Sequence, residues 1–98
     1  MNGYLVAHIT VKDRNKWGEY TQKASQTINA VGGEVLFKDE NPEILAGQAD
    51  PRTCVVLRFP DKAVLTQWYH SSEYQSLVPL REQAADVQFL ACHTTLEA

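Results

Sequence analysis

The segment WYHSSEYQSLVPLR, residues 68 to 81, is the part of the chain richest in side chains capable of chemistry. His70 can transfer protons near neutral pH, and Tyr69 can act beside it as an acid or a base. Arg81 can hold an anionic group through a bidentate fork of N–H donors. These residue types make the segment a candidate site for an aromatic or carboxylated metabolite, in which His70 or Tyr69 would be the catalytic acid or base.

Other side chains of the segment complete the predicted site. Glu73 can orient either the histidine or the arginine, because a carboxylate accepts hydrogen bonds from both. The residues that we expect to bind the substrate are Trp68, Glu73, Tyr74 and Arg81.

Each of these residues also has an ordinary structural explanation. A histidine near a helix C-terminus is favoured by the helix dipole, and an exposed arginine needs no special explanation. Trp68, Tyr69 and Tyr74 would cover a sheet at the place where a helix bends. Two classes of function therefore remain open. One is a binding or interaction module without chemistry, and the other is a small cofactor-independent enzyme with its site in a helix–sheet cleft.

The local sequence predicts a broken helix at this place. Ser72 to Gln75 matches a capping box, in which the serine oxygen accepts from a free backbone N–H and the glutamine reaches back to the cap. One helix should end near His70 and a second should begin at Ser72. Pro79, which disfavours a helical residue before it, then ends that turn or opens another.

Alternating and helical patterns give the elements that position this segment. Apolar alternation predicts strands, and spacings of three and four behind Asp13 and Asp61 predict capped helices. Gly32 and Gly33 end the first helix. The strands are expected at residues 4–11, 34–39, 53–59 and 86–96, and the helices at about 14–31 and 62–70.

This order of elements predicts one α+β domain over residues 1–98 with a ferredoxin-like split βαβ fold (βαββαβ). Right-handed crossovers place two helices on one face of a four-stranded antiparallel sheet. The other face should carry Tyr4, Val6, His8, Cys54 and Val56, which is too apolar a set to remain in water. We therefore predict a homodimer through this sheet face.

Composition restricts the partners. The chain has 98 residues and a formal net charge of −3, so a nucleic-acid partner is not indicated. No basic leader or long apolar span suggests a membrane, and the expected location is the cytoplasm. Cys54 and Cys92 should be free thiols, because two strand spacings would separate them.

No metal or cofactor is expected. The three histidines occur singly, without the spacing of a metal motif, and the glycines form no phosphate-binding loop. His8 and His93 lie on the first and last predicted strands, which are neighbours, and the patterns leave open whether they take part in a site.

The stretches YLVAHITVKD, GGEVLFK and VVLRFPDKAVLTQWYHSSEYQSLVPLR together resemble domain of unknown function 1330, a family of small bacterial proteins in the dimeric α+β barrel superfamily. The most specific element matches W-Y-[NH]-S-x-E-Y-Q, from Trp68 to Gln75. The resemblance implies a homodimer whose two sheets pack face to face, and no established reaction. Relatives in the superfamily include cofactor-free monooxygenases, isomerases and haem enzymes. The enzyme alternative is therefore monooxygenase- or isomerase-like, and haem or iron enters only by this analogy.

Overall fold

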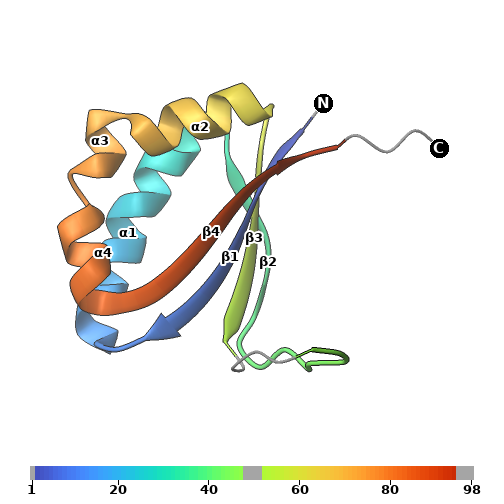
Figure 1. The fold of residues 1–98 in the computed structure, drawn as a ribbon. Coiled ribbons are helices and arrows are strands. Elements are labelled where there is room, and N and C mark those ends of the chain that lie inside the picture. The colour runs from blue at the N-terminus through green and yellow to red at the C-terminus, as the bar shows by residue number, and fades with distance from the viewer. Residues whose placement is uncertain (1, 48–51, 95–98) are drawn as a thin grey trace.

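Residues 2–47 and 52–94 are described by the structure, a computed structural model (Figure 1). They form four strands and four helical segments in the order β1 (Gly3–Val11), α1 (Arg14–Ala30), β2 (Glu34–Asp39), β3 (Thr53–Phe59), α2 (Lys62–His70), α3 (Ser72–Gln75), α4 (Val78–Ala84) and β4 (Ala85–His93). The predicted split βαβ order is confirmed. The predicted break in the second crossover is also confirmed, because α2 ends at His70, α3 follows directly, and α4 begins next to Pro79.

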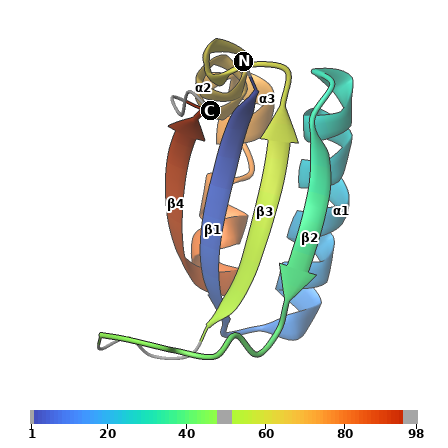
Figure 2. The same cartoon turned by 90° about the vertical axis from the view of Figure 1, so that its right-hand side faces the viewer.

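The strands form one antiparallel sheet in the order β2-β3-β1-β4, with β1 and β3 inside and β2 and β4 at the edges. A bulge between Val35 and Phe37 shifts the register of β2 against β3. All the helices lie on one face of the sheet, and Figure 2 looks onto the other face, which the described elements leave uncovered. None of the helices within the described ranges is long and apolar enough to cross a membrane.

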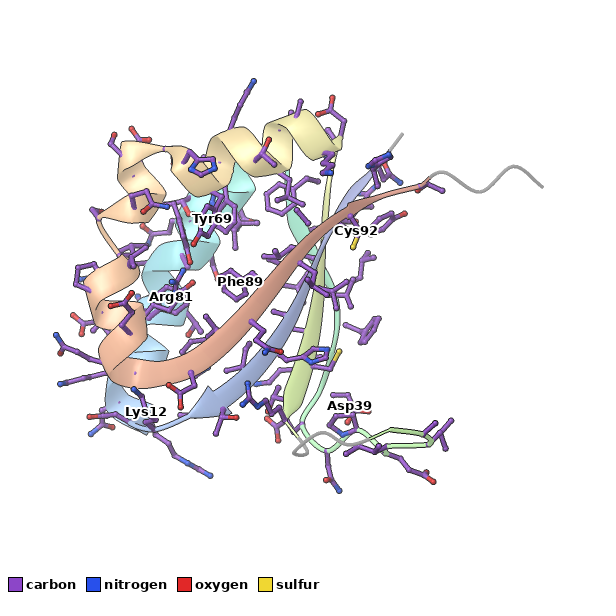
Figure 3. The ribbon with its side chains drawn as sticks, viewed as in Figure 1. Lys12, Asp39, Tyr69, Arg81, Phe89 and Cys92 are labelled. Atoms are coloured by element: carbon purple, nitrogen blue, oxygen red, sulfur yellow. The ribbon has the colours of Figure 1, made fainter. Side chains whose placement is uncertain are left out.

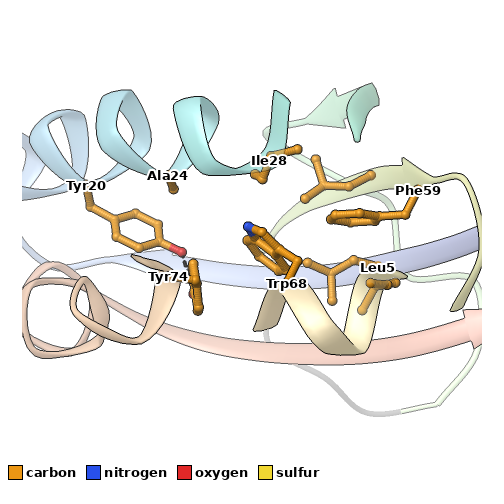
Figure 4. Close-up of a cluster of buried hydrophobic side chains, with 9 residues drawn as sticks. Leu5, Tyr20, Ala24, Ile28, Phe59, Trp68 and Tyr74 are labelled. Atoms are coloured by element: carbon orange, nitrogen blue, oxygen red, sulfur yellow. Dashed lines mark hydrogen bonds between the residues drawn. The ribbon is translucent and has the colours of Figure 1, made fainter. Parts of the chain in front are cut away.

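The core lies between the helices and the sheet (Figure 4). On β1 the buried side chains are Leu5, Ala7 and Ile9, which alternate with more exposed ones as a half-buried strand requires. Tyr20, Ala24 and Ile28 recur every four residues on α1 and form its buried stripe. These two patterns agree with the apolar alternation and the helical spacing that predicted the first strand and the first helix.

Two of the expected helix caps are present. The carboxylate of Asp13 accepts from the backbone N–H of Lys16 at 3.1 Å, and that of Asp61 accepts from Val64 at 2.8 Å. Gly32 follows α1 with a φ of 82°, a left-handed conformation that favours glycine.

The predicted cap at Ser72 is wrong by one residue. Ser71 has the extended backbone of a cap, and its hydroxyl accepts from the backbone N–H of Tyr74 at 3.2 Å. The Gln75 amide does not reach back to the cap, because it donates to the carbonyl of Tyr69 at 2.6 Å. Ser71 also donates to the carbonyl of Trp68, so one side chain ends α2 and starts α3.

The two cysteines are free, as predicted. Cys54 pairs with His8 and Cys92 pairs with Tyr4, on opposite sides of β1. One whole strand therefore separates the thiols. The last strand ends at His93, before the predicted boundary, and residues 95–96 of the predicted strand lie outside the described ranges.

Candidate functional site

Arg81 is buried, with only 8% of its surface exposed. An exposed position was the ordinary structural explanation for this arginine, and the structure contradicts it. Arg81 lies in the last turn of α4, and that short helix turns its side chain inward toward the sheet (Figure 3). Full burial of arginine is rare unless the charge is paired, so this side chain needs an account.

Two buried tyrosines support the guanidinium. Arg81 Nη1 donates to the hydroxyl of Tyr74 at 2.9 Å, and a hydrogen bond of 2.7 Å joins that hydroxyl to the one of Tyr20. Burial raises the pKa of both phenols, so both stay neutral well above pH 7. Burial acts to lower the pKa of Arg81, but the hydroxyls of Tyr69 and Tyr74 outweigh it and the pKa is raised. The site therefore holds a full positive charge.

The structure provides no counter-ion for this charge within the described ranges. All four ion pairs found there involve other residues. The Nε of Arg81 is buried and has no hydrogen-bond partner among the described residues. On its other side the guanidinium carbon lies 5.3 Å from the ring centre of Phe89, a cation–π contact. Neutral hydroxyls and an aromatic ring thus surround a cation that retains an unused donor.

A cleft of about 350 Å³ opens beside Arg81, between α2, α4 and β4; we call it the Arg81 cleft. Its polar wall consists of Thr66, Tyr69, His70 and Arg81. Its apolar wall comes from the helix-facing side chains of the sheet and one helix residue, namely Leu5, Leu65, Val87, Phe89 and Ala91. Its volume is typical of a site for a small organic molecule, and its few polar groups lie on one side.

Tyr69 and His70 lie together at the end of α2. Their rings meet edge to face with centres 5.3 Å apart, and Tyr69 also meets Tyr74 at 5.3 Å and Phe89 at 6.4 Å. Figure 3 shows Tyr69 pointing from α2 toward Arg81, with Phe89 reaching up from β4. His70 is exposed as a whole while still lining the cleft, so it stands at the entrance.

The other predicted site residues, Trp68, Glu73 and Tyr74, do not line the Arg81 cleft. Trp68 and Tyr74 are buried in the core at 3% and 0% exposure, and neither lines the Arg81 cleft. Trp68 instead packs on Phe59, and Tyr74 acts on the cleft through its hydrogen bond to Arg81. The exposed Glu73 does not line the cleft, and its carboxylate accepts from the Ser72 hydroxyl at 3.4 Å.

Two residues at the site escaped the sequence analysis. Phe89 lines the cleft and covers the guanidinium, and Tyr20 completes the hydroxyl chain. Alternation along β4 would have placed Phe89 on the helix-facing side, and the apolar stripe of α1 already included Tyr20. The sequence holds no signal that joins either residue to Arg81, because those contacts link distant elements.

His8 and His93 are not brought together. His8 pairs with Gln88, whereas His93 pairs with Gly3 at the other end of the same ladder. Among the residues that the structure describes, no group of three or more His, Cys, Asp or Glu side chains could hold a metal ion.

A larger space lies on the other side of Leu5 and Phe89. This chamber of about 750 Å³ runs between α1 and the sheet, and we call it the α1 chamber. Leu5 and Phe89 line both it and the Arg81 cleft. The two spaces therefore adjoin at these two side chains within the helix–sheet layer.

The fold and the buried site define a ferredoxin-like α+β protein with a helix–sheet cleft. The chain belongs to the family described as Domain of unknown function (DUF1330), whose model matches residues 2–94. No curated protein matches it.

Solved structures share the fold at low sequence identity. A protein of unknown function from Rhodopseudomonas palustris is 12% identical, with a TM-score of 0.79 over 98% of this chain and 84% of that one. A dimeric ferredoxin-like protein of unknown function from Jannaschia sp. CCS1 is 10% identical, with a TM-score of 0.72 over 96% and 100%. SnoaB, a cofactor-independent oxygenase from Streptomyces nogalater, is 7% identical, with a TM-score of 0.66 over 98% and 95%.

Proposed function

We propose that this protein binds a small organic carboxylate in the Arg81 cleft, with Arg81 as the counter-ion. The observation that carries the proposal is the buried guanidinium, which lacks a carboxylate partner within the described ranges and keeps Nε free of hydrogen bonds. A carboxylate is planar and accepts two parallel N–H bonds, so it matches the arginine fork.

Energetics favour a ligand over a purely structural role. Burial of a charge without a partner costs on the order of several kcal/mol, and neutral tyrosines recover only part of it. A bound carboxylate would neutralise the charge in a place where water screens little. The apolar wall of Leu65, Val87 and Phe89 would contact the body of the ligand and select an aromatic or aliphatic one.

Calorimetric titration with benzoate tests this function. We expect binding to the unmodified protein and loss of binding in Arg81→Met, which keeps the length of the side chain and removes its charge. Lys62→Met is the matched control, because Lys62 is an exposed cation of α2 that does not line the cleft. Equal benzoate affinity in Arg81→Met and the unmodified protein, or no binding by any small carboxylate, rejects the proposal.

One arrangement favours an enzyme as the second candidate. Tyr69 and His70 line the same cleft as Arg81, so a bound carboxylate would lie within reach of two groups that move protons. The candidate is a cofactor-independent, monooxygenase- or isomerase-like enzyme, and the fold it shares with SnoaB is compatible with it. Turnover of a bound acid that is lost in Tyr69→Phe or His70→Ala, with binding retained, would support this candidate. Turnover unaffected by both changes would exclude these residues as the catalytic ones.

The proposed working form is a cytoplasmic homodimer through the uncovered sheet face. Phe37, Val56, Val6 and Leu90 form an apolar row across all four strands on that face. Phe37 and Leu90 are more than half exposed in the single chain, at 53% and 59%. A second copy of the sheet would cover the row, and the Jannaschia protein of the same fold is described as dimeric.

A further inference from the structure

The α1 chamber opens to water at a rim of exposed residues, so it is a groove and not a sealed void in the core. Protein interiors are packed about as densely as organic crystals, and voids larger than a water molecule are few. Small residues of α1 border this space, namely Gly18, Thr21, Ala24 and Ser25, and the exposed Gly18 and Ser25 lie at its opening. A Cβ atom added to Gly18 would meet no atom within 4 Å. Helix α1 thus leaves a hollow above the sheet.

Apolar and aromatic side chains line the inside of this hollow. Trp17 and Tyr20 stack with ring centres 5.0 Å apart on α1, and Trp68 lines it from α2. Ile9 and Val55 are part of its floor on the sheet. An apolar groove of this size in contact with water is a feature of ligand-binding surfaces.

Charge is confined to the rim, where it is mainly positive. Arg14 and Lys38 are exposed and Arg52 is half-buried, whereas Glu40 is the one acidic side chain among the chamber residues. Lys38 and Glu40 pair at 3.2 Å and offset each other. An anionic molecule would therefore be attracted toward the opening, while the interior offers mainly apolar contact to its body.

We infer that the ligand of the Arg81 cleft is amphipathic, with its carboxylate at Arg81 and an apolar, ring-bearing body that extends past Phe89 into the α1 chamber. This inference rests on the proposed function and adds the class of ligand. Phe89 lines both spaces, so its ring contacts the ligand where head and body join. The flat walls of Trp17 and Trp68 favour aromatic rings over a branched aliphatic body.

Tryptophan fluorescence can locate the body of the ligand. Both tryptophans of the chain line the α1 chamber and neither lines the Arg81 cleft. A covalently bound bromine quenches indole fluorescence only near contact. The first probe is para-bromobenzoate, which is small enough to fit within the Arg81 cleft. The second is a biphenyl carboxylic acid with bromine on its distal ring. The same biphenyl acid without bromine corrects for absorption.

We expect the bromobiphenyl acid to quench the fluorescence as it binds, and para-bromobenzoate to bind without quenching. Gly18→Leu should weaken the binding of the biphenyl acid by about tenfold, because the new side chain takes up space in the chamber. The affinity for para-bromobenzoate should not change. The open space at Gly18 and the higher helix propensity of leucine make this variant safe for folding. Gln26→Leu is the control, an exposed α1 position outside the chamber.

The outcomes separate this inference from the proposed function. Arg81→Met should weaken the binding of both acids. Suppose that Arg81→Met weakens the binding of para-bromobenzoate. The amphipathic ligand is then rejected, and the carboxylate site is retained, if the bromobiphenyl acid does not bind, does not quench the fluorescence, or binds equally well to Gly18→Leu and the unmodified protein. If Arg81→Met affects neither acid, the carboxylate site is rejected, and the inference that rests on it is rejected too.

Discussion

At the scale of single residues, Arg81 distinguishes a structural account of the site from a functional one. A side chain that only holds the core together gives stability, whereas a binding residue is often placed at the expense of stability. Arg81 is buried among neutral side chains, and its Nε has no hydrogen-bond partner in the part of the chain that the structure describes, which is an unfavourable place for a charge in the absence of ligand.

The first prediction concerns stability without ligand. Arg81→Met should change the free energy of unfolding by less than about 1 kcal/mol or raise it, because an apolar side chain replaces an uncompensated buried charge. Leu65→Ala, at 2% exposure, should cost about 2 to 5 kcal/mol in the same urea titration. If Arg81→Met lowers the free energy of unfolding as much as Leu65→Ala does, the arginine stabilises the core.

The second prediction concerns pH and the two buried phenols. The pKa values of Tyr20 and Tyr74 are raised in the folded chain, so the folded state holds these protons more tightly than the unfolded state. Their contribution to stability is complete below about pH 10, the ordinary tyrosine pKa, and is lost as the pH rises above it.

Phenolate absorbance measures this directly. At about pH 10.5, close above the ordinary value, Tyr20→Phe with Tyr74→Phe should leave the absorbance of the folded protein almost unchanged. In urea the same double substitution should remove the signal of two phenolates. An equal decrease in the folded and the unfolded protein would show that these hydroxyls ionise freely, against the buried hydroxyl chain.

At the scale of elements, the break after α2 brings Tyr69 and Arg81 to one cleft. Ser71 fixes this break, because its hydroxyl bonds to the last turn of α2 and to the first turn of α3. We predict that Ser71→Ala costs about 0.5 to 2 kcal/mol of stability, the usual range for a lost cap. Ser72→Ala should cost distinctly less, since Ser72 is exposed and its hydroxyl only meets Glu73 at 3.4 Å. Thermal unfolding measures both variants. A larger loss of stability in Ser72→Ala than in Ser71→Ala would indicate that Ser72 is the cap.

Local patterns predicted most of the elements. The bounds of β3 and α2 follow from the alternation in TCVVLRF and from the Asp61 cap, which act over a few residues. The choice between Ser71 and Ser72 could not be made, because both serines can cap and the backbone of Ser71, with φ −66° and ψ 150°, decides between them.

The site was predicted only in part, for a similar reason. Tyr69, His70 and Arg81 were named from residue type, and the structure places all three on one cleft. The burial of Arg81 depends on where α4 starts and how it packs against β4. The residue type alone does not give this information, because most arginines are exposed. Contacts of Arg81 with Phe89 and Tyr74 are tertiary, so residue patterns could not give them.

At the scale of the whole molecule, the uncovered sheet face predicts the assembly. Val6 lies in the middle of the apolar row, so Val6→Asp would bury a carboxylate at the centre of the interface and should give a monomer at micromolar concentration. Gln67→Asp, on the exposed side of α2, adds the same charge away from the sheet and should leave the dimer intact. Sedimentation of both variants measures this, and a monomeric unmodified protein would contradict the proposed dimer.

A crystal structure with para-bromobenzoate, in which the anomalous scattering of bromine marks the ligand, would show whether a carboxylate binds at Arg81. We expect a bromine peak in the Arg81 cleft beside Val87 and Phe89, and a carboxylate oxygen within about 3.2 Å of a guanidinium nitrogen of Arg81. A saturated crystal with bromine only outside the cleft, and with the Arg81 guanidinium still without an anion, would contradict it.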